Sequence, residues 1–225
     1  KNKIKININS IKNPYLGNSY DSNYIKKIIK KRETEFQEKK INIIEYDQKK
    51  ILNEVALNIS EQKIVGFFQG RMEFGSRALG NRSILADPRS HEIKNILNSK
   101  IKRRESFRPF APSILQDEVS NWFKVNDQVP YMSKVYEIKD NKRDKVPAIV
   151  HVDGTGRLQT VTPETNLRFY NLIKIFQKIT NVPIILNTSF NENEPIVCNP
   201  KEALDCFLRT KMDVLVMENF LIIRN

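Results

Sequence analysis

Apolar side chains recur at helical spacing near the start of the chain. Residues 21–39 and 48–60 each place them on one face, and in the second segment Ile51, Val55 and Ile59 follow one another at every fourth position. Each pattern predicts an amphipathic helix, because one side can pack on a core while the other side faces water.

The pattern changes after residue 63. Short apolar runs bounded by glycine, proline or asparagine predict strands, and longer periodic segments between them predict helices. This alternation indicates an α/β or α+β fold. Strands are expected at 64–69, 83–88, 108–115, 131–137, 148–152, 158–161, 183–187, 214–217 and 220–223, and helices at 90–101, 164–179 and 200–209.

Two of these helices have clear start signals. Thr162 precedes Pro163 and Asn199 precedes Pro200, so each helix begins with a capping side chain followed by proline at its first position. Glu202 stands three residues after Asn199 and predicts a capping box there.

Residues 13–17 have turn-forming composition and no hydrophobic period. They predict a connector that arrives from something upstream. We interpret 1–50 as a linker with lead-in helices from a missing N-terminal domain, and 51–225 as the domain that carries the function.

The formal net charge of +12 is unevenly distributed. Residues 1–50 carry 13 basic and 6 acidic side chains, residues 71–110 carry 10 and 4, and residues 111–225 carry 14 and 14. The first surplus is lysine-rich and is typical of a solvated face. The second surplus is arginine-rich and interleaved with glycine and proline, so it is the better candidate for a binding site.

Several classes of protein are disfavoured. Two cysteines are too few for a disulfide scaffold and indicate a reducing compartment, and we expect a cytoplasmic location because no membrane span or signal peptide is evident. His91 and His151 are the only histidines, which leaves no multi-histidine metal site in the chain.

Segment 70–89 places four arginines among three glycines, so that guanidinium groups can reach an anion where the backbone also approaches it closely. This pattern predicts a phosphate-type site. The alternative is a surface turn in which the arginines pair with Glu73 and Asp87.

Segment 101–113 adds Lys102, Arg103, Arg104 and Arg108 near prolines that stiffen the chain. Positioned cations of this kind suit phosphoryl or acyl-phosphate chemistry. A basic helix end would account for Arg103 or Arg104, but it explains Arg108 less well.

Two later segments offer further polar groups. In 151–161 we expect a strand, a glycine-bracketed turn and a second strand, with Arg157 at the turn. Segment 186–197 contains Asn187 and Ser189 at the end of a strand, where they suit a sugar, a phosphate or a carbonyl oxygen, although a simple polar turn would look the same. Ser189 lacks the surroundings of a serine nucleophile.

Taken in order, FGSRALGNRSILADPR, IKRRESFRPFAPS, HVDGTGRLQTV and LNTSFNENEPIV resemble the C-terminal, YrdC-like domain of the O-carbamoyltransferase family, which includes nodulation and antibiotic-biosynthesis enzymes. The resemblance implies a YrdC-like twisted mixed β-sheet flanked by helices. It also implies formation of carbamoyl-adenylate from carbamoyl phosphate and ATP, for transfer to a hydroxyl acceptor by an N-terminal domain.

The same resemblance assigns residues to roles. Arg77, Lys102 and Arg108 would bind carbamoyl phosphate and act in catalysis, whereas Arg157, Ser189 and Asn187 would bind the nucleotide. Magnesium is expected with ATP, and iron only in the missing N-terminal domain. One departure is a serine at position 76, where the family pattern leads us to expect proline.

Other functions remain open at the level of sequence. A threonylcarbamoyl-adenylate synthase would use bicarbonate and threonine in a similar fold, and a degenerate domain would only bind nucleotide. An RNA-binding module suits the positive charge, but the balanced charge after residue 110 and the lack of an aromatic nucleic-acid motif disfavour it. The sequence identifies neither the hydroxyl acceptor nor the oligomeric state.

Overall fold

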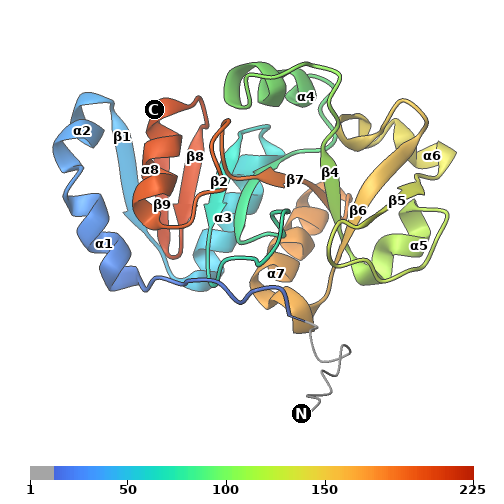
Figure 1. Ribbon diagram of the computed structural model, residues 1–225, viewed down its shortest axis with the longest axis horizontal. Helices are drawn as coiled ribbons and strands as arrows, with labels where there is room; N and C mark the ends of the chain where they lie inside the picture. Colours follow the sequence, from blue (N-terminus) through green and yellow to red (C-terminus); the bar gives the residue numbers. More distant parts are fainter. Residues whose placement is uncertain (1–12) are drawn as a thin grey trace, which may run out of the picture.

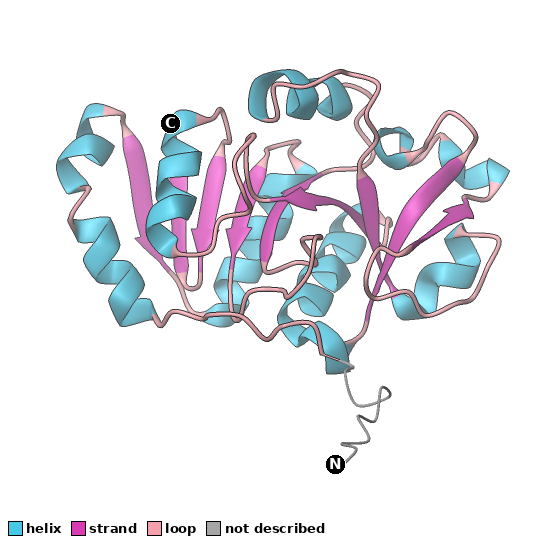
Figure 2. Cartoon of the chain, in the orientation of Figure 1, coloured by secondary structure: helices cyan, strands magenta, loops and turns pink. Residues whose placement is uncertain are grey.

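The computed structural model describes residues 13–225, and its centre is a nine-stranded sheet (Figures 1 and 2). The strand order is β1-β9-β8-β2-β3-β7-β4-β6-β5, so strands distant in sequence are neighbours in the sheet. The strands are β1 (Ile41–Glu45), β2 (Val65–Phe68), β3 (Arg82–Ala86), β4 (Ala111–Leu115), β5 (Lys134–Glu137), β6 (Thr155–Val161), β7 (Ile184–Ser189), β8 (Val214–Met217) and β9 (Phe220–Arg224).

The sheet is mixed. Strand β2 pairs in parallel with β8, and β4 pairs in parallel with β6, while the other neighbours are antiparallel. The central register sets Ser83 of β3 opposite Ser189 of β7, and Ala111 of β4 opposite Asn187. The end of β7 is thereby fixed beside the loops that precede β3 and β4.

Helices cover both faces of this sheet (Figure 1). Helix α7 packs on β4, β6 and β7. It also packs on α3, which contacts β2. Helix α8 packs on β2 and β8. The helices are α1 (Ser22–Lys30), α2 (Glu33–Glu38), α3 (Gln48–Ser60), α4 (Ile93–Ile96), α5 (Val119–Trp122), α6 (Asp140–Arg143), α7 (Pro163–Thr180) and α8 (Pro200–Arg209).

Strand β2 shows how the core forms on two sides. All four of its residues are buried, as expected for a central strand with packing on both faces. Phe67 lies 6.5 Å from the ring of Phe169 in α7, measured between centroids. The neighbouring residue Gly66 faces the other way, where an added Cβ would lie 2.8 Å from the ring of Phe190.

Several predicted elements are confirmed. The helices predicted at 48–60 and 200–209 have those bounds in α3 and α8, and the strand predicted at 214–217 is β8. Thr162 and Asn199 cap α7 and α8 as expected. The α/β class of the prediction is confirmed by the mixed sheet with its flanking helices.

Other predictions need correction. The single helix expected at 21–39 is two helices, because Arg32 leaves helical geometry between α1 and α2. Residues 148–152 form no strand: a 3₁₀ turn, Pro147–Ile149, takes the first two of them, and a turn begins at Val152. The helix expected at 90–101 is the short α4 followed by a π-helix, Leu97–Ile101.

Two local details also differ. Glu202 does not complete a capping box with Asn199, because its carboxylate accepts from the backbone N–H of Cys198 at 2.7 Å. Strand β1 was not predicted, yet it pairs with β9 at the edge of the sheet. The division of the chain at residue 50 stays a prediction, and part of it, residues 1–12, lies outside the described residues.

Within residues 13–225 we find no helix that is both long and apolar enough to cross a membrane.

Candidate functional site

The loop between β2 and β3 is built around a buried carboxylate. Oε1 of Glu73 accepts backbone N–H groups from Leu79 and Asn81 at 2.7 Å and from Arg82 at 3.1 Å. Gly80 is left-handed, with φ of +110°, and an added Cβ would lie 2.3 Å from the ring of Phe169. The sequence of this loop therefore fixes the path of residues 74–80, which we call the Arg77 loop.

Arg82 supports the loop from beneath and does not face a ligand. Its side chain is fully buried, lies 3.7 Å from the centroid of the Phe68 ring, and donates to the backbone carbonyls of Gln69, Asn18, Gly70 and Asn81. Arg89 pairs with Asp87 at 2.6 Å. Of the arginines in segment 70–89, Arg77 is the one that reaches the candidate site.

A small cavity of about 90 Å³ brings together residues from distant parts of the chain. Arg77 comes from its loop, Arg104 from the segment after the π-helix, and Arg157 from β6. We call this the anion cavity. Its lining residues are Ser76, Arg77, Ala78, Arg104, Pro109, Phe110, Ala111, Met132, Arg157, Asn187, Thr188 and Ser189.

The three arginines lack carboxylate partners. Neither Arg77, Arg104 nor Arg157 forms an ion pair within the described part of the chain. Burial, then the charge of Arg77, lowers the pKa of Arg157, and burial, then the charge of Arg108, lowers the pKa of Arg104. Like charges held close together without an ion-paired carboxylate favour an anionic ligand.

Neutral polar groups complete the wall of the anion cavity. Asn187 is buried, and its Nδ2 donates to Oγ of Ser113 at 3.0 Å and to Oε1 of Gln159 at 2.9 Å. Its Oδ1, like Nε of Arg157, is buried and has no hydrogen-bond partner among residues 13–225. Unsatisfied buried polar atoms are rare, and these two belong to residues that line the cavity, so a ligand there could bond them.

Lys102 is close to the anion cavity but does not line it. Its Nζ is surrounded by oxygen atoms of a single turn, donating to the carbonyl of Ser189 at 2.5 Å and to the carbonyl and Oδ1 of Asn191 at 2.7 Å. Burial, then the charge of Arg104, lowers the pKa of Lys102 to about 7. In this arrangement Lys102 holds the turn that carries Ser189.

Arg108 lies outside the cavity as well. Its side chain is half-exposed, and the nearest carboxylate, that of Glu105, is 3.9 Å away. Its charge affects the pKa of Arg104, so the two guanidinium groups are near one another. Of the six site residues predicted from sequence, the structure brings Arg77, Arg157, Asn187 and Ser189 together and sets Lys102 and Arg108 at the periphery.

Sequence reasoning left Arg104 out of the predicted site residues, because a basic helix end could account for either Arg103 or Arg104. Arg104 is held toward the cavity by a hydrogen bond from its Nε to Oδ1 of Asn98 at 2.7 Å and by the ring of Phe110, 4.9 Å from its guanidinium carbon. The prediction that Arg157 lies at a turn is also wrong. That turn lies at residues 152–154, and Arg157 is within strand β6.

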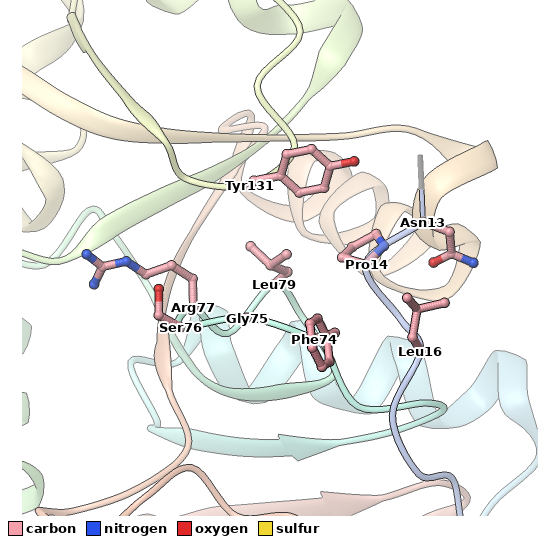
Figure 3. Close-up of a pocket in the computed structure, with 9 residues that line it drawn as sticks. All are labelled: Asn13, Pro14, Leu16, Phe74, Gly75, Ser76, Arg77, Leu79 and Tyr131. Atoms are coloured by element: carbon pink, nitrogen blue, oxygen red, sulfur yellow. The ribbon is translucent and has the colours of Figure 1, made fainter. Parts of the chain in front are cut away.

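A wider groove of about 340 Å³ lies next to the anion cavity and shares Ser76 and Arg77 with it. Residues 13, 14 and 16 form one side, and the Arg77 loop and Tyr131 form the rest (Figure 3). The side chain of Phe74 is 79% exposed here. In Figure 3 the Arg77 side chain points away from Phe74.

The fold and the site define an α/β domain with a cationic cavity at the end of a central strand. The family model described as the carbamoyltransferase C-terminus matches residues 56–224. The chain belongs to this family.

Relatives agree with that assignment. The nodulation protein NolO of Bradyrhizobium diazoefficiens is 50% identical over 163 residues, which cover 71% of this chain and 30% of NolO. The protein sll1178 of Synechocystis is 44% identical over 198 residues, or 79% of this chain and 32% of that protein. The chain thus spans about a third of the length of these relatives.

A solved structure is similar in fold. Full-length HypF in its phosphate- and nucleotide-bound form matches with a TM-score of 0.54 and 20% identity, over 75% of this chain and 25% of HypF. The predicted family and the predicted YrdC-like fold class are confirmed by these comparisons and by the mixed sheet.

Proposed function

We propose that this chain is the adenylate-forming part of a carbamoyltransferase. It binds carbamoyl phosphate and ATP, forms carbamoyl-adenylate, and passes it to an N-terminal domain that transfers the carbamoyl group to a hydroxyl acceptor. Family membership supports transfer of a carbamoyl group, and the site supports the choice of phosphate-bearing substrates.

One observation carries the proposal: Arg77, Arg104 and Arg157 meet at a small polar cavity, and none of them forms an ion pair with a carboxylate of the described residues. Carbamoyl phosphate and the phosphates of ATP bring several negative charges together, and fixed arginines reduce their repulsion. Because the side chains are held before the ligand arrives, little reorganisation is needed when charge develops in the transition state.

The reaction balances in two steps. Water releases inorganic phosphate from carbamoyl phosphate and leaves carbamate. A carbamate oxygen then attacks the α-phosphorus of ATP, forming carbamoyl-adenylate and expelling pyrophosphate. Both steps handle phosphate groups, so a cationic cavity would serve each of them.

The residues have distinct places in this proposal. Arg77, Arg104 and Arg157 contact phosphate oxygens, and Ser189 and Asn187 contribute polar contacts from β7. Lys102 positions Ser189 through the carbonyl that it binds. Arg108 at the periphery adds positive potential that attracts the anions.

Magnesium is proposed as a companion of ATP. Within residues 13–225 no three His, Cys, Asp or Glu side chains come together in a way that could hold a metal ion. A magnesium ion would therefore be held chiefly by the phosphates of ATP, as is common where the protein supplies few carboxylates.

Exchange of labelled pyrophosphate into ATP tests the proposal. We expect exchange that requires carbamoyl phosphate, and we expect Arg157→Met to lower its rate by about 10²- to 10³-fold, the usual cost of removing one fixed donor to developing charge. Arg209→Met is the matched control, because Arg209 pairs with Glu192 and Glu194 away from the cavity.

Two results would contradict the proposal. Exchange that depends on threonine and bicarbonate would identify a threonylcarbamoyl-adenylate synthase instead. Binding of ATP without exchange, in the full-length protein as well as in this chain, would show that the domain does not form an adenylate.

A further inference from the structure

A segment near the start of the described chain, residues 13–18, runs beside residues 70–74, which lead into the Arg77 loop. We call residues 13–18 the strap. Its backbone bonds are Gly17 N–H to Met72 O at 2.9 Å, Met72 N–H to Asn18 O at 2.9 Å, and Phe74 N–H to Pro14 O at 2.7 Å. The pairing resembles a short antiparallel ladder outside the sheet.

The two backbones are unusually close at Gly17. A Cβ at this position would lie 2.8 Å from Cβ of Met72 and 3.0 Å from its carbonyl oxygen. Any larger residue would therefore push the strap away from residues 70–74. Arg71 adds a side-chain bond across the same contact, donating to the carbonyl of Leu16 at 2.9 Å.

Tyr15 connects the strap to the far end of the Arg77 loop. Its side chain is buried, and its hydroxyl donates to the carbonyl of Leu79 at 2.9 Å. Tyr15 packs with Leu79, Ala111 and Met132 in a small cluster apart from the main core. Ala111 and Met132 in turn line the anion cavity, so Tyr15 lies directly behind its wall.

Burial raises the pKa of Tyr15 far above its ordinary value. The hydroxyl therefore stays protonated at physiological pH and remains a donor to Leu79. The strap thus contacts the Arg77 loop near both ends, at Phe74 and at Leu79, while Arg77 lies between these two points.

We infer that the strap is a positioning element of the anion site, with Gly17 and Tyr15 acting on phosphate binding through Arg77. The inference rests on the proposed function and extends it to residues outside the cavity. It makes affinity for a phosphate-bearing ligand depend on the segment that precedes α1. Neither residue lines the anion cavity, so each acts through the loop that it holds.

Titration calorimetry with carbamoyl phosphate, and separately with inorganic phosphate, tests this inference on the full chain. We expect Gly17→Ala to weaken binding about tenfold or more, because a misplacement on the order of 1 Å is costly at a preorganised site. Tyr15→Phe should weaken binding about threefold to tenfold, the range for one hydrogen bond of ordinary strength. Tyr24→Phe removes a hydroxyl from an exposed ring and should leave binding unchanged.

A double-mutant cycle separates positioning from general loss of stability. In an Arg77→Met background, Gly17→Ala should no longer alter phosphate binding, since the residue through which it acts is gone. Its effect on the melting temperature should be the same in both backgrounds. All comparisons are made at matched folded concentration.

The outcomes are distinct. Wild-type binding that Gly17→Ala leaves unchanged, or a loss of equal size with and without Arg77, would refute the strap as a positioning element while the proposed function stands. A wild-type chain that binds neither anion would refute the proposed function and this inference with it.

Discussion

The rim of the anion cavity and the interior beneath it both contain arginine, in opposite surroundings. Arg77, at the rim, is exposed and has no carboxylate partner among the described residues, whereas Arg82, five positions later, is fully buried and donates to four backbone carbonyls. The comparison shows that an arginine-rich motif is not uniformly a ligand site. Its buried arginine holds the loop, and its exposed arginine is available to an anion.

The same contrast holds across the turn that follows β7. On one side Arg104 and Arg157 face the cavity without an ion pair to any described residue, while on the other side Glu192 pairs with Arg103 at 2.7 Å and with Arg209 at 2.8 Å. The number of hydrogen-bond and ion-pair partners therefore separates the arginines that stabilise the fold from those that are available to bind an anion.

The largest effect is expected at the buried position. Arg82→Met should lower the free energy of unfolding by about 4 kcal/mol, because it leaves several buried carbonyls without donors. Arg77→Met should change it by no more than about 0.5 kcal/mol, as for an exposed side chain without partners. Urea denaturation of both variants measures these changes. Similar losses of unfolding free energy in the two variants would contradict the distinction between the rim arginine and the buried arginine.

Next in size is stabilisation by a bound anion. Inorganic phosphate at about 100 times its dissociation constant should raise the free energy of unfolding by about 2.7 kcal/mol through mass action. Arg104→Met should abolish most of this gain, and Arg209→Met should retain it. Thermal and chemical unfolding with and without phosphate measure the gain, and an equal gain in both variants would place the anion elsewhere.

A pH effect is expected from Lys102. Its pKa of about 7 in the folded protein lies below the ordinary value of 10.5, so the unfolded chain binds more protons between these two pH values. The contribution of this group to stability therefore rises with pH above about 7, by at most about 1.4 kcal/mol per pH unit. The difference in unfolding free energy between wild type and Lys102→Met should show this rise from pH 7 to 9. Parallel curves would mean that Lys102 is charged normally.

The smallest effect on stability is expected when the carboxylate shared by Arg103 and Arg209 is removed. Glu192→Gln should lower the free energy of unfolding by about 1 kcal/mol, since both arginine partners are substantially exposed and their ion pairs are weakened by water. Binding of inorganic phosphate should stay the same. A marked change in phosphate affinity would connect this ion network to the anion cavity.

Much of the fold could be predicted because its signals are local. Caps and apolar periodicity give α8 its bounds, and the apolar run at 214–217 gives β8. Strand β1 has a weaker signal: three of its five residues are isoleucine, but Asn42 and Glu45 are exposed at the sheet edge, and its pairing with β9 joins residues about 180 positions apart. Pairing over that distance depends on tertiary context that a single sequence does not state.

The site was predictable as a set of segments but less so atom by atom. Arg103 and Arg104 are adjacent and chemically identical, yet Arg103 takes the left-handed conformation, with φ of +43°, and pairs with Glu192. Arg104 instead bonds Asn98 and lines the cavity. Nothing in the residue pattern distinguishes the two, because the difference arises from the backbone after the π-helix.

The central claim is that the three unpaired arginines form one phosphate-binding site. Titration calorimetry of carbamoyl phosphate into wild type, Arg157→Met and Arg209→Met tests it most directly. The account predicts one site per chain in wild type and Arg209→Met, with affinity reduced by about 10²-fold or more in Arg157→Met. Equal affinity in all three proteins would contradict it.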